Sequence, residues 1–538
     1  MKRYINILMV ALATMMTSCL TEDPRDQLYE EDIYNNANNI YINAVAVLYN
    51  YIGGSADSEG LQGTCRGIYD YNTLTTDEAM IPIRGGDWYD GGLWTNMYQH
   101  KWSPNDLPLY NTWKYLYKVV VLSNKSLHII DKYSHNLSEE QRVAYEAEVR
   151  ALRALFYYYI MDMYGRVPIV TSYEQPQDEV VQSERSEVFR FIVNELQEVA
   201  ELLPNERSNK MGNYYGRITT PVANFLLAKL ALNAEIYCDD NWTDGVPRNG
   251  KEIFFTVDGE KLNAWQTCIK YCNKLAEVGY RLEDDYSYNF SVHNENSNEN
   301  IFTIPLDKNL YAAQFWYLFR SRHYNHGGAL GGSSENGTSA NISTVLANGY
   351  STDDVDARFE KNFYAGIVEV DGKPVMMDNG QQLEYFPLEL KLNLKGISYV
   401  KTAGARMAKY EVDRTSHSDG RQPDNDIVLF RYADALLMKS EAKVRNGEDG
   451  SLELNEVRGR VGMPYREATL ENILKERLLE LVWEGWRRQD MVRFGVYHKS
   501  YDQRVQLADE KNGYTTVFPI PQKSIDLNPK LKQNVGYK

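Results

Sequence analysis

The sequence is poor in residues that build metal sites. Five cysteines and eight histidines are spread over 538 residues, without a CxxC pair or a histidine spacing typical of zinc. His323 and His326 lie three residues apart, but no carboxylate or third histidine completes a ligand set. We therefore expect no metal and no cofactor. Cation binding stays open at Asp239, Asn241 and Asp244, which lack the glycine and terminal glutamate of an EF-hand loop.

Long apolar runs are also absent beyond the N-terminus. No other stretch approaches the roughly 18 to 20 apolar residues of a membrane helix. The N-terminus has a basic start at Lys2 and Arg3 and a short apolar run at 5–16, and it ends in Thr17-Ser18-Cys19, which resembles a bacterial lipobox. We expect residues 1–18 to be removed as a signal peptide and Cys19 to carry lipid as the only membrane attachment. An ordinary signal peptide with a chance cysteine is the alternative.

Acidic residues follow this cysteine at once. Glu22 and Asp23 resemble the export signal that sends Bacteroidetes lipoproteins to the cell surface, and a chance acidic linker is the alternative. The whole chain has 58 basic and 74 acidic residues, and loss of residues 1–18 leaves 56 against 74, a net charge of −18. Nucleic acids and polyanionic glycans are therefore poor partners.

The composition is that of a folded protein with many amphipathic aromatics. Hydrophobic residues make up 43% and charged residues 25% of the chain, which is ordinary for a globular protein. The 41 Tyr and 9 Trp exceed the 16 Phe. Their large apolar faces and polar groups suit half-wet surfaces such as those that sugars present, although we expect most of them to pack between helices.

Helical patterns dominate the first half. Ser138 and Gln141 form a capping box at the start of a helix predicted over 138–165, and Thr220-Pro221 starts another that runs towards residue 237. Helix starts near 138, 183, 220 and 262 indicate stacked helix pairs, a degenerate tetratricopeptide-like array at most. The predicted helices cover 113–130, 138–165, 183–203, 220–237, 262–278, 432–446, 452–461 and 470–494.

The helical pattern fades between residues 286 and 425. Gly, Asn, Ser and Asp clusters dominate there, with short strand-like pieces such as 301–304. We predict one mainly α body over 19–538, with a helical core at about 38–285 and 426–500 and a loop-rich insertion at about 286–425. Cys268 and Cys272 are one helical turn apart, so they share a helix face, and Cys238 of the preceding predicted helix could pack against that face. This predicts buried thiols, with one disulfide among them as the alternative.

One helix carries a carboxylate pair that a general acid and base could use. Glu480 and Glu484 lie one turn apart. Arginines of the same predicted helix, such as Arg477 and Arg487, favour a structural ion-pair lattice over a catalytic site. We therefore predict that this pair is structural.

The C-terminal third resembles the SusD/RagB family in several spaced blocks. With the lipobox and the segment from Thr76-Asp77-Glu78 to Trp102, the likeness covers essentially the whole mature chain. The blocks are Phe430-Arg431-Tyr432-Ala433-Asp434-Ala435-Leu436-Leu437, Glu441-Ala442, Val457-Arg458-Gly459-Arg460, Glu476-Arg477-Leu478-Leu479-Glu480-Leu481, Glu484-Gly485-Trp486-Arg487-Arg488-Gln489-Asp490, Phe518-Pro519-Ile520-Pro521, Asn528-Pro529 and Gln533-Asn534.

The resemblance implies a SusD-like α/α fold and a lipid-anchored outer-membrane protein that faces the cell exterior. It further implies glycan capture for a SusC-like TonB-dependent transporter, without catalysis. A neutral plant polysaccharide such as a β-glucan or xyloglucan is the expected ligand, because the acidic chain repels charged ones. The alternatives are an oligopeptide-capturing RagB-like protein and, with no supporting block, a surface glycoside hydrolase.

Two aromatic segments are the candidate ligand sites. In the glycine-rich segment 84–94, Trp88 is expected to lie exposed against a pyranose while Arg84 and Asp87 hydrogen-bond hydroxyls, and Trp94 is expected to pack under the loop. SusD-like proteins commonly place variable loops after a segment like 300–305, and there the second-tier candidates are Tyr311, Trp316 and Tyr324, each with ordinary burial as the alternative.

Overall fold

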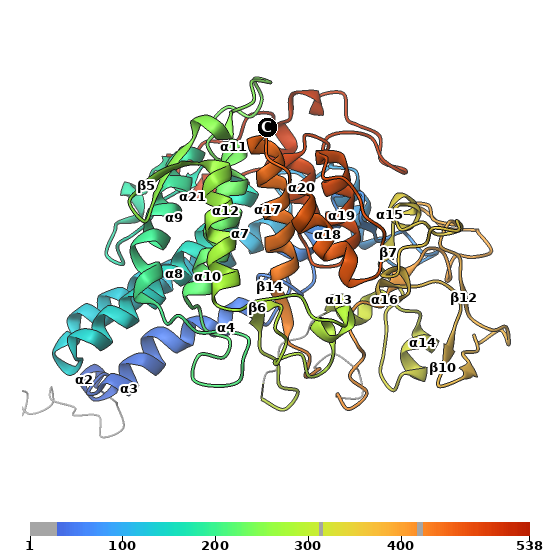
Figure 1. The fold of residues 1–538 in the computed structure, drawn as a ribbon, viewed down its shortest axis with the longest axis horizontal. Helices are drawn as coiled ribbons and strands as arrows, with labels where there is room; N and C mark the ends of the chain where they lie inside the picture. The colour runs from blue at the N-terminus through green and yellow to red at the C-terminus, as the bar shows by residue number, and fades with distance from the viewer. Residues whose placement is uncertain (1–28, 311–315, 417–422, 538) are drawn as a thin grey trace, which may run out of the picture.

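A computed structural model of the chain describes residues 29–310, 316–416 and 423–537 (Figure 1). The fold is mainly helical, as predicted, and its strands form short two-stranded sheets. No helix in these ranges is long and apolar enough to cross a membrane. The predicted signal peptide and Cys19 lie outside the described residues.

The long helices pack against one another, mostly with a helix that lies close to them in the sequence. Helix α7 packs on α8, α8 on α9, α10 on α12, and α12 on α17 (Figure 1). These helices are α7 (Leu107–Lys132), α8 (Glu139–Tyr164), α9 (Arg185–Val199), α10 (Thr220–Leu232), α12 (Ala264–Glu277), α17 (Tyr432–Asn446), α18 (Ser451–Arg460) and α19 (Leu470–Leu481).

The shorter elements connect this helical body and build most of the 286–425 insertion. The short helices are α2 (Glu30–Ile33), α3 (Ala37–Ile40), η1 (Tyr41–Ala46), α4 (Val47–Gly53), α5 (Ile68–Thr73), η2 (Asp90–Gly92), α6 (Leu93–Tyr98), α11 (Ala234–Tyr237), η7 (Tyr286–Phe290), α13 (Trp316–Arg320), α14 (Tyr324–Ala329), α15 (Ile342–Ala347), α16 (Phe359–Asn362), α20 (Arg487–Arg493) and α21 (Gln522–Leu527).

All strand pairs in the described ranges are antiparallel. The pairs are β1 (Ala79–Met80) with β7 (Ser339–Ala340), β2 (Val167–Pro168) with β3 (Gln182–Ser183), β4 (Phe254–Val257) with β5 (Glu260–Asn263), β6 (Asn300–Ile304) with β14 (Ile427–Arg431), β8 (Phe363–Tyr364) with β13 (Arg406–Met407), β9 (Gly366–Ile367) with β12 (Glu384–Tyr385), and β10 (Glu369–Val370) with β11 (Lys373–Pro374). Three of them, β8–β13, β9–β12 and β10–β11, lie within the insertion.

Local capping chemistry explains the best-predicted helices. Ser138 and Gln141 form the predicted capping box of α8, which ends at Tyr164 with Gly165 as its C-cap. Pro221 lies in the first turn of α10, where its missing N–H costs no helical hydrogen bond. Helix α10 is buried on every side, which is why its sequence is apolar without a polar face.

The helix predicted over 470–494 is wrong in its middle. Helix α19 ends at Leu481 and α20 begins at Arg487, because Trp483 and Gly485 adopt left-handed backbone angles of 69° and 73°. The break is held by tertiary contacts. The backbone N–H of Trp483 donates to the Glu78 carboxylate at 2.8 Å, and the Trp483 indole donates to the Asn362 carbonyl at 3.0 Å.

Glu480 and Glu484 are buried in a cluster of ion pairs, as the structural reading predicts, but the partners come from distant segments. Glu480 pairs with Arg358 from the insertion, Arg431 at the end of β14, and Arg460 of α18. Although burial opposes its ionisation, these arginines hold the pKa of Glu480 well below its ordinary value. Arg431 also pairs with Glu299 and Glu484. The lattice is therefore tertiary, not confined to one helix.

The cysteines of the described residues are free thiols. Cys65, Cys268 and Cys272 are buried and Cys238 is half-buried. Cys268 and Cys272 lie on the same buried face of α12, as predicted.

We expect Arg431→Met to lower the free energy of unfolding by about 3 to 5 kcal/mol, because three buried carboxylates lose a partner at once. Urea unfolding of the mature chain measures the change. Arg414→Met is the matched control, since Arg414 pairs with Asp371 in an exposed position and its loss changes stability little. Equal unfolding midpoints for the two variants would contradict the structural role of the cluster.

Candidate functional site

The glycine-rich segment 84–94 forms a tight turn followed by a strained stretch. The Arg84 N–H donates to the Asp87 carbonyl at 3.0 Å and the Asp87 N–H returns to the Arg84 carbonyl at 3.2 Å, with Gly85 left-handed at a φ of 72°. Beyond the turn, Trp88 and Asp90 also adopt positive φ angles, 63° and 41°. Such angles are costly for residues with a side chain, so the surrounding contacts must hold this stretch in place.

Trp88 is half-buried and firmly held. Its indole N–H donates to the Glu335 carbonyl at 3.1 Å, and its ring meets Trp94 edge-on with ring centroids 6.1 Å apart. Gly337 lies against the indole, since a Cβ added there would come within 2.7 Å of the Trp88 ring. Trp94 is 1% exposed, which confirms that it packs under the loop, whereas Trp88 is less exposed than expected.

The prediction that Arg84 binds ligand hydroxyls is corrected. Arg84 is 1% exposed, and its guanidinium donates to the chain's own oxygens. It bonds to the carbonyls of Gly337, Val400 and Ala403 and to the Ser339 hydroxyl, at 2.7 to 3.3 Å. Burial lowers its pKa well below the ordinary value. Arg84 therefore fixes the loop to the insertion and does not line the adjoining cavity.

Asp87 and Tyr324 contact each other, so the two predicted ligand segments each contribute a residue to one site. The Tyr324 hydroxyl donates to Asp87 Oδ2 at 3.1 Å, and Lys401 Nζ lies 3.3 Å from the same oxygen and 5.1 Å from the Tyr324 ring centroid. Burial, then the charge of Asp87, raises the pKa of Tyr324 to about 12. Tyr324 is 40% exposed, which leaves part of its ring open to solvent.

These residues surround a cavity of about 520 Å³. Its lining residues are Cys65, Arg66, Gly86, Asp87, Trp88, Asp90, Tyr324 and Glu335. Arg66 pairs with Asp57 at 2.6 Å and with Asp90 at 3.0 Å, and its guanidinium lies 5.5 Å from the Trp94 ring centroid. Ring faces, carboxylates and a guanidinium around one opening suit a ligand that offers both C–H faces and many hydroxyls.

Sequence reasoning missed Arg66, Asp90, Glu335 and the adjacent Lys401. The glycine-rich run over 53–67 could have pointed to a second loop at the site. Nothing in the sequence pattern indicates that residues 335 and 401 lie beside residue 88. Two predicted candidates are not placed: Tyr311 and the Trp316 side chain lie outside the described structure, although α13 begins at residue 316.

The histidine pair is part of the protein interior. Burial and nearby cationic groups lower the pKa of His323 to about 4 and that of His326 to about 3, so both are neutral at pH 7. His326 lies against Tyr364 and Tyr385. Within the described ranges, no group of three or more His, Cys, Asp or Glu side chains could hold a metal ion.

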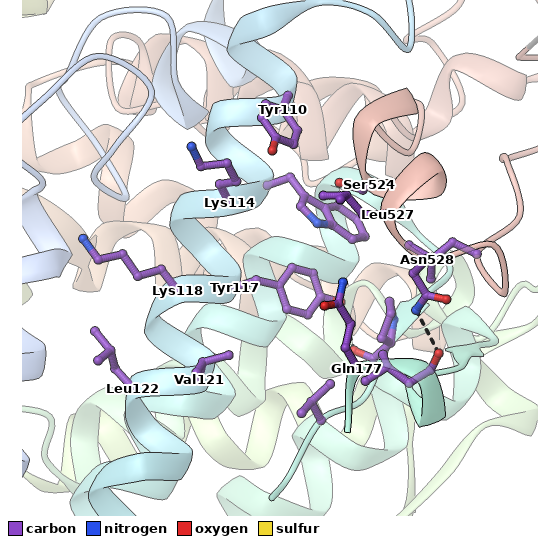
Figure 2. A pocket seen from close by; sticks show the side chains of 15 residues that line it. Tyr110, Lys114, Tyr117, Lys118, Val121, Leu122, Gln177, Ser524, Leu527 and Asn528 are labelled. Atoms are coloured by element: carbon purple, nitrogen blue, oxygen red, sulfur yellow. Dashed lines mark hydrogen bonds between the residues drawn. The ribbon is translucent and has the colours of Figure 1, made fainter. Parts of the chain in front are cut away.

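A second cavity, of about 440 Å³, lies between α7 and α21 (Figure 2). Figure 2 shows Tyr110 and Tyr117 of α7 on one side and Leu527 and Asn528 on the other. The Asn528 amide is already used, because it donates to the Val180 carbonyl at 2.9 Å. The lining is mostly apolar and offers hydroxyl groups few partners, so this cavity fits a polyhydroxylated ligand less well than the cavity at Trp88.

We expect Gly337→Ala to displace the Trp88 indole and lower the free energy of unfolding by about 1 to 3 kcal/mol through overpacking. Urea unfolding and tryptophan emission report the two effects. Gly328→Ala is the control, since no atom lies within 4 Å of its added Cβ and its φ is not left-handed. Unchanged emission and stability in Gly337→Ala would show that Trp88 is not held by this contact.

Two family models match the chain. One, described as the SusD family, matches residues 279–537, and the other, described as "Starch-binding associating with outer membrane", matches residues 32–232. The curated starch-binding protein SusD of Bacteroides thetaiotaomicron is 25% identical, over 90% of this chain and 89% of that protein.

Solved structures share the fold over almost the whole chain. A "Laminarin binding SusD-like protein" is 20% identical with a TM-score of 0.69, covering 93% of this chain and 100% of the other. Surface glycan-binding protein A from Bacteroides thetaiotaomicron, in complex with laminarihexaose, gives 20% identity and a TM-score of 0.69, with 92% and 99% coverage. At this identity the likeness establishes the fold, and the predicted SusD-like helical architecture is confirmed.

Proposed function

The chain belongs to the SusD/RagB family, and from this premise we propose that it captures glycan at the cell surface and delivers it to a SusC-like TonB-dependent transporter. The family's members are non-catalytic glycan-binding proteins associated with the outer membrane. The observation that carries the proposal is the convergence of Asp87, Trp88 and Tyr324 on one cavity.

In this cavity the rings and the charged groups would have separate tasks. Because the Trp88 N–H is satisfied within the protein, its exposed ring surface is left to meet the C–H face of a pyranose. Asp87 and Asp90 can accept hydrogen bonds from sugar hydroxyls, and Arg66 can donate to them. The contacts that hold Asp87 to Tyr324 and Lys401 would keep its carboxylate in place before ligand arrives.

The charge of the site supports a neutral glycan. Carboxylates of Asp87, Asp90 and Glu335 outnumber the single lining cation, Arg66, and the chain as a whole is acidic. A uronate or sulfate group would be repelled. Laminarin, a neutral glucan, is named for one structural neighbour, which is in keeping with a β-glucan or xyloglucan ligand for this chain.

We propose that residues 19–538 act as one body rather than as separate domains. The cavity supports this, since Arg66 and Trp88 belong to the N-terminal part while Tyr324 and Glu335 belong to the 286–425 insertion. The proposed anchor is lipid on Cys19. An oligopeptide ligand is the alternative for the same cavity, and binding to a peptide panel with no binding on a glycan array would favour it.

Trp88→Ala is expected to weaken glycan affinity roughly tenfold or more, equivalent to about 1.4 kcal/mol, because the sugar loses its stacking surface. Isothermal titration calorimetry against laminarin and xyloglucan measures the affinity. Tyr89→Ala is the matched control, since this neighbouring aromatic is 59% exposed but does not line the cavity. Equal affinity for Trp88→Ala and wild type would refute the site assignment.

Cys19→Ala is expected to release the protein from the membrane fraction, because no other membrane attachment is proposed. Cell fractionation followed by immunoblotting measures this. Digestion of the wild-type protein by protease added to intact cells would support the outward orientation. Protection until lysis would contradict surface display.

A further inference from the structure

We propose that the chain has a second glycan-binding cleft, formed by α9 and the β4–β5 hairpin. This inference rests on the proposed glycan-binding function and extends it to a separate place on the molecule. The cleft has a volume of about 540 Å³. Figure 1 places α9 and β5 near one end of the long axis and α14, which carries Tyr324, towards the other.

The floor of this cleft is apolar and well packed. Phe189 and Val193 of α9 and Phe255 of β4 are buried there, and the rings of Phe189 and Phe255 meet edge-on with centroids 6.0 Å apart. Cys238 completes the floor, and burial raises the pKa of its thiol to about 12. The floor is therefore uncharged at neutral pH and suits the C–H face of a sugar ring.

The rim carries polar side chains on one face of α9. Arg190, Asn194 and Gln197 follow one another at spacings of four and three residues, so they share a helix face. Within the described residues the Asn194 carboxamide makes no hydrogen bond, and the Arg190 guanidinium bonds only to the Ser186 hydroxyl, at 3.0 Å, without a carboxylate partner. A planar amide and an unpaired guanidinium can donate hydrogen bonds to sugar hydroxyls.

An exposed aromatic stands at the opening. Phe254 is 54% exposed, although Phe189 and Phe255, which also line the cleft, are buried. The hairpin that carries it is fixed to α9, because the Gln197 amide donates to the Thr256 carbonyl at 3.0 Å, and to α12, because Lys270 Nζ donates to the Val257 carbonyl at 3.4 Å. The Lys261 ammonium lies over the Phe254 ring, 4.4 Å from its centroid. Because Phe254 is still 54% exposed, the uncovered ring surface can serve as a platform on which a pyranose stacks.

The charge balance of the cleft supports a neutral glycan, the same class of ligand that is proposed for the cavity at Trp88. Arg190 and Glu252 are its charged lining residues and carry opposite signs, and the Lys261 ammonium lies over the Phe254 ring at the opening. A neutral oligosaccharide segment therefore fits better than a charged one. Two sites at separate ends of the protein would bind a long polysaccharide with an avidity that neither site has alone, while each short oligosaccharide binds one site independently.

Affinity gel electrophoresis with laminarin, xyloglucan or amylopectin in the gel tests this proposal. Wild type is expected to be retarded most, Trp88→Ala and Phe254→Ala each to keep part of the retardation, and the double variant to lose it. Phe254→Tyr is the matched control and should retain wild-type mobility, because the ring stays. Calorimetry with a hexasaccharide of the retarding glycan should give two bound ligands per chain for wild type and one for Phe254→Ala.

Two results would overturn the proposed second cleft and leave the proposed site at Trp88 unaffected. One is retardation equal to wild type in both single variants, Phe254→Ala and Asn194→Ala. The other is complete loss of retardation in the single variant Trp88→Ala. Far-ultraviolet circular dichroism checks that each variant is folded. A wild-type chain unretarded by all three polysaccharides would instead overturn the proposed function, and the second cleft with it.

Discussion

The buried charge cluster around Arg431 and Glu480 is the constraint on which the rest of the structure depends. Charges withdrawn from water are tolerated only when they are fully paired, so the segments that supply the partners cannot move independently. Arg358 ties the insertion to α19, Glu299 ties the start of β6 to the end of β14, and Arg460 adds α18. The helical body and the loop-rich insertion are thereby joined in one rigid frame. Both parts contribute residues to the cavity at Trp88, and this frame keeps them in register.

Helices were predictable where a local signal decides them. The capping box at Ser138 and the proline of α10 act within one helical turn, and the observed helices follow them. The break between α19 and α20 was not predictable, because it depends on residues far away in the sequence. Glu78 lies 405 residues from Trp483, and Asn362 lies 121 residues from it. Local pattern alone favours a continuous helix there, and tertiary contacts override it.

The candidate site likewise contains residues that the local sequence could indicate and contacts that it could not. Asp87 and Trp88 were singled out because aromatics in a glycine-rich loop are unusual, and Tyr324 was singled out through the family resemblance. Their meeting could not be foreseen, since Tyr324 lies 237 residues from Asp87 and Lys401 lies 314 residues from it. Arg84 was misread for the same reason. A guanidinium next to glycines resembles a ligand donor until its acceptors, all at residues 337–403, are known.

The two proposed clefts differ in how much order exists before ligand binds. At the first, the Trp88 N–H bond, the left-handed backbone and the Asp87 contacts hold Trp88 and Asp87 in place before any ligand arrives, so little entropy would be lost on binding. At the second, the hairpin is fixed but Asn194 and Arg190 have few contacts, and ordering them would offset part of the binding energy. The first cleft would then set which sugar is held, and the second would mainly add avidity for long chains. For the proposed delivery of glycan to a transporter, unequal affinities would favour release, because two tight sites on one protein molecule would retain the polysaccharide.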